Sequence, residues 1–237
     1  MPLFLQSVLE ASPLRSGVLL LPLIVTGAIF GVLCGVIIHR TGRFREIMWV
    51  GSFFMCLGFG LFISFDANTS TGRAVGFQMI AGLGQGILFE APLIAIQSQV
   101  EQEDVASATA TMAFVRNIAV SISVIVCGTI FQNSMSNRNG YLRDAGLSQN
   151  LLDDLDGENA LANVMLPSTF TNPAWKFAAK QAFAWATRNM WIMLTVVAFL
   201  ALVASLFVET AHLGTEHVET ITGLRKEKDP SNPDPAN

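Results

Sequence analysis

Long apolar stretches alternate with short polar segments along the whole chain. The first stretch, 17–38, carries no charged side chain and is followed directly by a basic cluster, Arg40, Arg43 and Arg45. A helix of about 22 residues is roughly 33 Å long, which is enough to cross the hydrocarbon core of a bilayer. Four further stretches of similar length lie at 47–65, 75–96, 113–131 and 190–208. The pattern predicts an all-α membrane protein with about five transmembrane helices.

The composition agrees with a membrane protein and argues against several other classes. Hydrophobic residues make up 51% of the chain and charged residues 14%, whereas about a quarter of the residues of a soluble domain are charged. The basic residues are scattered and lack interleaved aromatic side chains, so we expect no nucleic-acid partner. The three cysteines each fall in a different apolar stretch, which predicts neither a disulfide framework nor a metal site. No nucleotide motif or nucleophile–base pair stands out, so we expect neither an enzyme nor a cofactor.

The basic residues also predict how the chain is oriented in the bilayer. Three arginines follow the first stretch, and three basic residues lie at 225–228 in the tail. The opposite side carries Arg15 and Arg73. Because short cytoplasmic loops carry an excess of lysine and arginine, the segment 39–46 and the C-terminus are expected in the cytoplasm and the N-terminus outside.

This orientation divides the chain into five expected regions. They are an extracytoplasmic lead-in at 1–16 that is the remnant of a preceding helix, four spans within 17–131, an extracytoplasmic loop at 132–189, the last span at 190–208, and a disordered cytoplasmic tail at 209–237. Within the long loop, 148–155 is expected to form a short helix with a serine cap. Trp175, Ala178, Ala182 and Trp185 share one helical face, which predicts an interfacial helix that turns into the last span.

Glycines recur at helical spacing in two of the apolar stretches. Gly27, Gly31 and Gly35 fall on one face of the first predicted helix, where they allow another backbone to approach closely. Gly82 and Gly86 lie inside the third stretch. A phosphate-binding loop is excluded there, because no strand precedes these glycines and no Lys-Ser/Thr pair follows them. We therefore predict close helix packing at Gly27, Gly31, Gly82 and Gly86.

The third stretch holds the main candidates for chemistry. Glu90 is the only acidic residue within a predicted span, where a carboxylate is costly and usually faces a cavity or a partner. Two interpretations are open: Glu90 takes part in proton coupling or binds a cationic substrate, or it forms a structural hydrogen bond to a neighbouring helix. Gln85 and Gln78 are further polar candidates for a cavity, since seven residues separate them and place them on one helical face.

Arg116 is the only basic residue within a predicted span, near the start of the fourth stretch. It is expected to have a structural role, either pairing with an acidic residue such as Asp104 or extending to the membrane interface. A role in substrate gating is the alternative.

The segment GVIIHRTGR at 35–43 resembles the G-x-x-x-D-R-x-G-R signature of the major facilitator superfamily. Gly35, Arg40, Gly42 and Arg43 match the signature, and His39 stands at its acidic position. Three further segments, SVLEASPLRSGVLLLP, AGLGQGILFEAPLIAIQSQV and DVASATATMAFVRNIAVSIS, strengthen the match. Together they look like the C-terminal half of fungal-type fourteen-helix drug:proton antiporters, over about residues 3–208.

The resemblance implies a specific mode of action. Members of this family have two helical bundles with the substrate bound between them, and work by alternating access. The signature turn would lie on the cytoplasmic side, where it contributes to the inner gate or anchors on anionic lipid. The expected partners are a drug- or toxin-like small molecule, protons and the lipid bilayer, in the plasma membrane or alternatively the vacuolar membrane.

This chain provides only one of the two bundles, without most of its first helix. We therefore expect a fragment or truncated product that lacks the N-terminal half. The alternative function is a non-transporting membrane protein that only packs against partner helices, through the glycine face of its first span.

Overall fold

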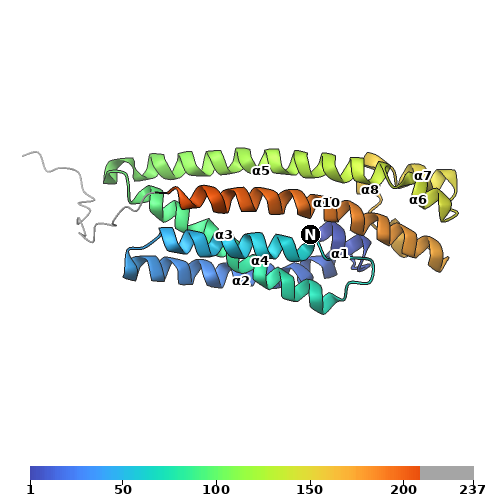
Figure 1. The fold of residues 1–237 in the computed structure, drawn as a ribbon, viewed down its shortest axis with the longest axis horizontal. Helices are drawn as coiled ribbons and strands as arrows, with labels where there is room; N and C mark the ends of the chain where they lie inside the picture. Colours follow the sequence, from blue (N-terminus) through green and yellow to red (C-terminus); the bar gives the residue numbers. More distant parts are fainter. Residues whose placement is uncertain (209–237) are drawn as a thin grey trace, which may run out of the picture.

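The computed structural model describes residues 1–208, so the predicted disordered tail lies outside the described residues. Five long helices run side by side in an elongated bundle (Figure 1), and all five are long and apolar enough to cross a membrane. They are α2 (Pro13–Thr41), α3 (Arg45–Phe62), α4 (Thr71–Gln97), α5 (Val105–Ser136) and α10 (Pro173–Leu206). The predicted all-α membrane fold with five spans is confirmed.

Polar residues at the helix ends explain where the long helices begin and end. The Ser12 hydroxyl accepts a hydrogen bond from the backbone N–H of Arg15, so α2 begins at Pro13, ahead of the apolar stretch. Ser70 caps α4 in the same way. The helix α2 ends at Gly42, whose φ of +67° is a conformation that glycine adopts without steric cost. The signature turn therefore reverses the chain immediately before α3.

The helix α4 packs on both α2 and α3, and a layer of aromatic rings ties this group to the rest of the bundle. The Phe62 ring of α3 lies 4.9 Å from the Trp191 ring of α10, between ring centroids. Phe65 stacks on Phe4, at 4.9 Å, and on Phe77 of α4, at 5.7 Å. Phe4 belongs to the short helix α1 (Pro2–Ser7), in which Phe4, Leu5 and Ser7 are buried. The lead-in at 1–16 is thus packed into the bundle.

The segment 132–189 differs from the expectation. The helix α5 continues to Ser136, and four short helices follow: α6 (Asn139–Asp144), α7 (Gln149–Asp154), α8 (Gly157–Ala162) and α9 (Leu166–Thr169). The predicted short helix at 148–155 corresponds to α7. From Pro173 the chain forms one continuous helix of 34 residues. At about 51 Å, α10 is longer than the hydrocarbon core is thick, so part of it extends outside.

The residues predicted to form the interfacial helix therefore belong to the first half of α10, continuous with the last span. Ala178 and Ala182 are buried in the protein core. The guanidinium of Arg138 lies over Trp185, 4.2 Å from the centroid of the Trp185 ring. Alanine is only weakly hydrophobic, so the sequence does not show whether a face rich in alanine contacts lipid or another helix. Here the small side chains allow α1 and α6 to pack on α10.

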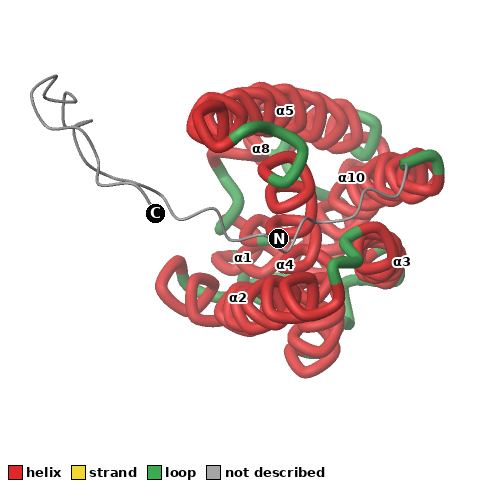
Figure 2. Tube along the Cα trace, turned by 90° about the vertical axis from the view of Figure 1, so that its left-hand side faces the viewer, coloured by secondary structure: helices red, strands yellow, loops and turns green. Residues whose placement is uncertain are grey.

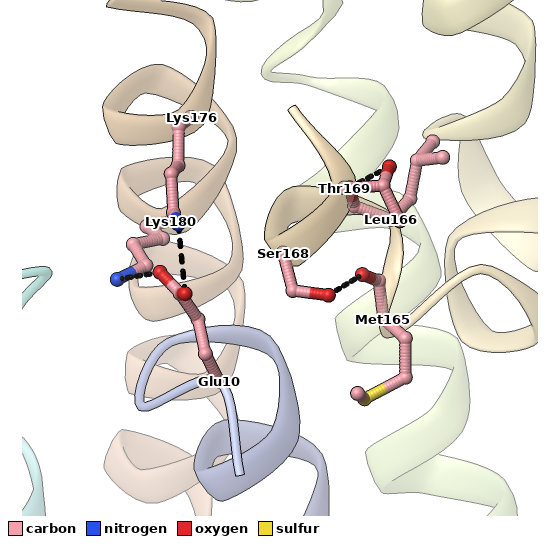
Figure 3. Close-up of polar contacts among 7 residues, drawn as sticks. All are labelled: Glu10, Met165, Leu166, Ser168, Thr169, Lys176 and Lys180. Atoms are coloured by element: carbon pink, nitrogen blue, oxygen red, sulfur yellow. Dashed lines mark hydrogen bonds and ion pairs between the residues drawn. The ribbon is translucent and has the colours of Figure 1, made fainter. Parts of the chain in front are cut away.

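A charged clamp holds the link between α1 and α2 against α10 (Figure 3). Glu10 accepts Lys176 Nζ at 2.8 Å and Lys180 Nζ at 2.5 Å, from consecutive turns of α10. Its φ of +54° is unusual for a residue that is not glycine. Burial opposes ionisation of Glu10, but the hydrogen bonds and charges of the two lysines outweigh it and lower its pKa below the ordinary value. The clamp fixes where α2 begins.

Candidate functional site

The crossing of α2 and α4 positions the candidate residues, and glycines make this crossing close. A Cβ added at Gly82 would lie 2.5 Å from the backbone oxygen of Leu23, and one added at Gly86 would run into the carbonyl of Gly27. Gly31 faces Gly86 from the other side. The four glycines predicted to pack closely, Gly27, Gly31, Gly82 and Gly86, thus meet one another across a single interface. Gly35 does not take part, because a Cβ there would meet nothing within 4 Å.

Glu90 lies one turn beyond this crossing and is half-buried against α2. Its Cγ would be 3.5 Å from a Cβ added at Gly31, which is an ordinary van der Waals distance, so Glu90 packs beside the glycine face of α2. The hydrogen bonds and ion pairs found in residues 1–208 do not include the Glu90 carboxylate. The structural hydrogen bond considered for Glu90 is therefore not formed with any described residue.

Arg116 reaches from α5 to the same turn of α4. Its Nη2 donates a hydrogen bond to the carbonyl oxygen of Phe89 at 3.0 Å, and its guanidinium lies 4.1 Å from the centroid of the Phe89 ring. Pro92, three residues on, interrupts the regular hydrogen bonding of α4 because it has no N–H to donate. The expected ion pair with Asp104 is not formed: in the described part of the chain, both ion pairs belong to Glu10.

The two glutamines of α4 lie in different environments. Gln85 is exposed one turn before Phe89, so the two side chains share a face. Gln78 is fully buried, and neither its Oε1 nor its Nε2 has a hydrogen-bond partner. The shared helical face of Gln78 and Gln85 therefore does not make them neighbours in one accessible site. Of the three polar candidates on α4, Gln85 and Glu90 are accessible and Gln78 is not.

The sequence did not indicate Phe89 as a site residue, although Phe89 is the residue of α4 that Arg116 contacts. Its side chain is 52% exposed and lies under Arg116. Its position four residues after Gln85 and beside Glu90 was the only available signal, and phenylalanine in a membrane span is ordinarily a lipid-facing or packing residue. Beside Arg116 a shallow hollow of about 340 Å³ runs along α5, lined by Ala119, Val120, Ser123, Val124 and Cys127.

The signature turn separates into two groups of residues. His39, Arg40 and Arg43 are exposed. Arg45 instead donates a hydrogen bond to the Leu206 carbonyl at 3.3 Å and stacks over Trp49 at 4.6 Å. Together with the bond from Trp49 Nε1 to the Ser205 carbonyl, at 2.8 Å, this contact fastens α3 to the end of α10.

Metal binding has no support in the described residues. No group of three or more His, Cys, Asp or Glu side chains is placed to hold an ion between residues 1 and 208. The three cysteines, Cys34, Cys56 and Cys127, are free thiols.

Comparisons with known proteins identify what the chain is similar to. Residues 1–124 match the family described as Major Facilitator Superfamily. The chain is 36% identical over 229 residues to "Efflux pump dotC" of Dothistroma septosporum, which covers 96% of this chain and 39% of that protein. It is 36% identical over 227 residues to "MFS-type transporter ppz2" of Metarhizium majus, covering 96% and 39%.

A third relative, "Efflux pump FUS6" of Gibberella fujikuroi, is 33% identical over 232 residues, covering 98% of this chain and 41% of that protein. The chain thus spans about two fifths of the length of the curated relatives it matches. No solved structure matches the chain.

Proposed function

The chain belongs to the major facilitator superfamily, and we propose that it forms the C-terminal bundle of a small-molecule efflux transporter. Two of the relatives named above are efflux pumps. The apolar helices support an integral, multi-pass membrane protein. We assign it to the plasma membrane, with the vacuolar membrane as the alternative, and place the signature turn on the cytoplasmic side.

The observation that carries the proposal is an unpaired carboxylate within an apolar span. A charged group in a membrane helix is costly and is usually retained for function. The hydrogen bonds and ion pairs of residues 1–208 do not include the Glu90 carboxylate, and the exposed Gln85 and Phe89 precede Glu90 on the same helix. We infer that Gln85, Phe89 and Glu90 form the substrate-contacting surface of α4.

The chemistry of this surface indicates its ligand. The Phe89 ring offers an apolar platform, Gln85 a neutral hydrogen-bonding group and Glu90 a negative charge. Such a set suits a hydrophobic molecule with one polar or cationic group. In the proposed mechanism this bundle rocks against a second bundle, and Glu90 exchanges a proton for the substrate. The second bundle would be the part of the relatives' length that this chain does not span.

The glycine face gives less support to the alternative of a non-transporting protein. That alternative requires the face at Gly27, Gly31 and Gly35 to be free to pack against a helix of another protein. In the structure, α4 of the same chain already occupies Gly27 and Gly31.

Efflux measurements test the proposal. Cells that express the protein are loaded with ethidium, a lipophilic cation, or Nile red, an uncharged dye, and dye loss is followed by fluorescence. We expect Glu90→Gln to slow ethidium efflux at least tenfold, at unchanged surface expression. Glu101→Gln is the matched control, because Glu101 is exposed just beyond the same helix. Ethidium efflux that proceeds normally in Glu90→Gln would remove Glu90 from the mechanism, and no efflux above empty cells in the unmodified protein would refute transport of these dyes.

A further inference from the structure

A second hollow lies on the surface of the bundle between α2 and α3, with α4 behind it. Figure 2 shows α5 on the opposite side of the bundle from α2, so this hollow is separate from the one that runs along α5. It is a groove of about 350 Å³. Apart from Glu46 and the Cys34 thiol its lining is apolar, and the walls are formed by Phe30, Leu33, Ile37, Ile47, Val50 and Phe54.

The groove lies within the depth of one membrane leaflet. Along α2 it extends from Phe30 to Ile37, which is about 10 Å. One leaflet contributes about 15 Å of hydrocarbon, half of the bilayer core. The end of the groove near Ile37 and Ile47 adjoins the signature turn. This end of the groove therefore lies close along the chain to the basic residues of the turn.

Three charged side chains surround this end of the groove. Arg40 follows Ile37 by one turn of α2, Arg43 lies in the turn, and Glu46 lines the mouth. All three are exposed, and no hydrogen bond or ion pair engages their charged groups within residues 1–208. Arg45 is already committed to Leu206 and Trp49. The free charges are thus two positive groups and one negative group.

We propose that this groove binds one molecule of phosphatidylserine from the cytoplasmic leaflet. An acyl chain lies in the apolar groove, where it covers Leu33 and Val50. The headgroup has a phosphate, a carboxylate and an ammonium group, which is the charge pattern complementary to Arg40, Arg43 and Glu46. Phosphatidylserine is an anionic lipid of the cytoplasmic leaflet, the side to which the proposed orientation assigns the signature turn.

Lipid binding to the purified protein in detergent tests the proposal. The melting temperature is measured against added dioleoyl phosphatidylserine, phosphatidylglycerol or phosphatidylcholine, and against glycerophosphoserine, which has the headgroup without acyl chains. We expect saturable stabilisation in the order phosphatidylserine, phosphatidylglycerol, phosphatidylcholine, and none by glycerophosphoserine. Stabilisation by glycerophosphoserine alone would reassign the site to a soluble anion.

Substitutions test the contribution of the charged residues to lipid binding separately from that of the apolar groove. Arg43→Gln should weaken phosphatidylserine binding about fivefold, since a basic residue at an anionic surface contributes about 1 kcal/mol. Glu46→Gln should remove the preference for phosphatidylserine over phosphatidylglycerol, which lacks the ammonium group. Arg15→Gln, at the other end of α2, is the control and should change neither.

Filling the groove should abolish binding of all three lipids. Val50→Trp is the first choice, because Val50 is 47% exposed and its neighbours leave room. Leu33→Trp, at a position 45% exposed, replaces it if that variant does not fold. The proposal is overturned if the folded, filled variant still binds phosphatidylserine, or if the unmodified protein binds phosphatidylserine and phosphatidylcholine equally.

Discussion

Substitution of Gly82 by alanine should separate α2 from α4. A Cβ at this position would lie 2.5 Å from the backbone oxygen of Leu23 and 3.2 Å from Cβ of Thr26. The first distance is about 0.9 Å short of the 3.4 Å at which ordinary van der Waals contact begins. Because Leu23 contributes a backbone atom, no side-chain rotation relieves the overlap. The two helices must move apart.

The cost follows from the size of that movement. A gap of 0.5–1 Å forfeits about a quarter to a half of the dispersion energy of each affected contact. Overpacking of this kind costs about 3 kcal/mol, while the higher helix propensity of alanine returns about 1 kcal/mol. The net loss of about 2 kcal/mol should lower the melting temperature by roughly 4–8 °C for a chain of this size.

Thermal unfolding in detergent micelles, followed by tryptophan fluorescence, measures this effect. Gly76→Ala is the matched control, since Gly76 lies on the same helix and a Cβ there meets nothing within 4 Å. The control should melt at the same temperature as the unmodified protein or slightly above it. Equal melting temperatures for Gly82→Ala and Gly76→Ala would refute the close crossing of α2 and α4.

Three further predictions test other parts of the structure. Gln78→Met should raise the stability by about 1–3 kcal/mol, because it removes two buried polar atoms without partners; a lower melting temperature than that of the exposed control Gln85→Met would contradict this. Because folding lowers the pKa of Glu10, the clamp stabilises the protein at pH values above 4.5, the ordinary pKa of the carboxyl group. This stabilisation is lost as the pH falls through the lowered pKa of the folded protein. At pH 6, Glu10→Gln should therefore be less stable than the unmodified protein by up to about 1 kcal/mol. The difference should close as the pH falls through the lowered pKa of Glu10; a difference independent of pH would count against the clamp. Arg116→Gln should cost about 1 kcal/mol, because it loses the stacking on Phe89 and a charged hydrogen bond; unchanged melting would show that this contact contributes nothing.

The spans and the glycine contacts were predictable because both depend on local periodicity. An uncharged run of about 20 residues has one stable form in a bilayer, the helix. Gly27 and Gly31, like Gly82 and Gly86, stand four residues apart, so each pair lies on one face. The sequence did not show that the glycines of α2 would pack against those of α4, or that Gly35 would lie outside this contact. Both depend on the angle at which the two helices cross.

The remaining differences come from contacts between distant parts of the chain. The spacing in the first half of α10 predicts an interfacial face, since the sequence does not reveal that Ala178 and Ala182 are buried inside the protein. Gln78 and Gln85 share a face by spacing, yet one lies in the core and the other is exposed. An ion pair with an acid was one of the roles expected for Arg116, but its guanidinium donates instead to the backbone carbonyl of Phe89. Periodicity along one helix cannot show which neighbours it will have.

The most direct test of the proposed substrate surface is protection of cysteine labels by an exported dye. The intact protein is prepared without its three native cysteines, and Phe89→Cys and Gln78→Cys are introduced separately. A membrane-permeant maleimide is then applied with and without excess ethidium. We expect the cysteine at 89 to be labelled and to be protected by ethidium, and the cysteine at 78 to remain unlabelled. Labelling at 89 that is unaffected by a dye the protein exports would contradict the account.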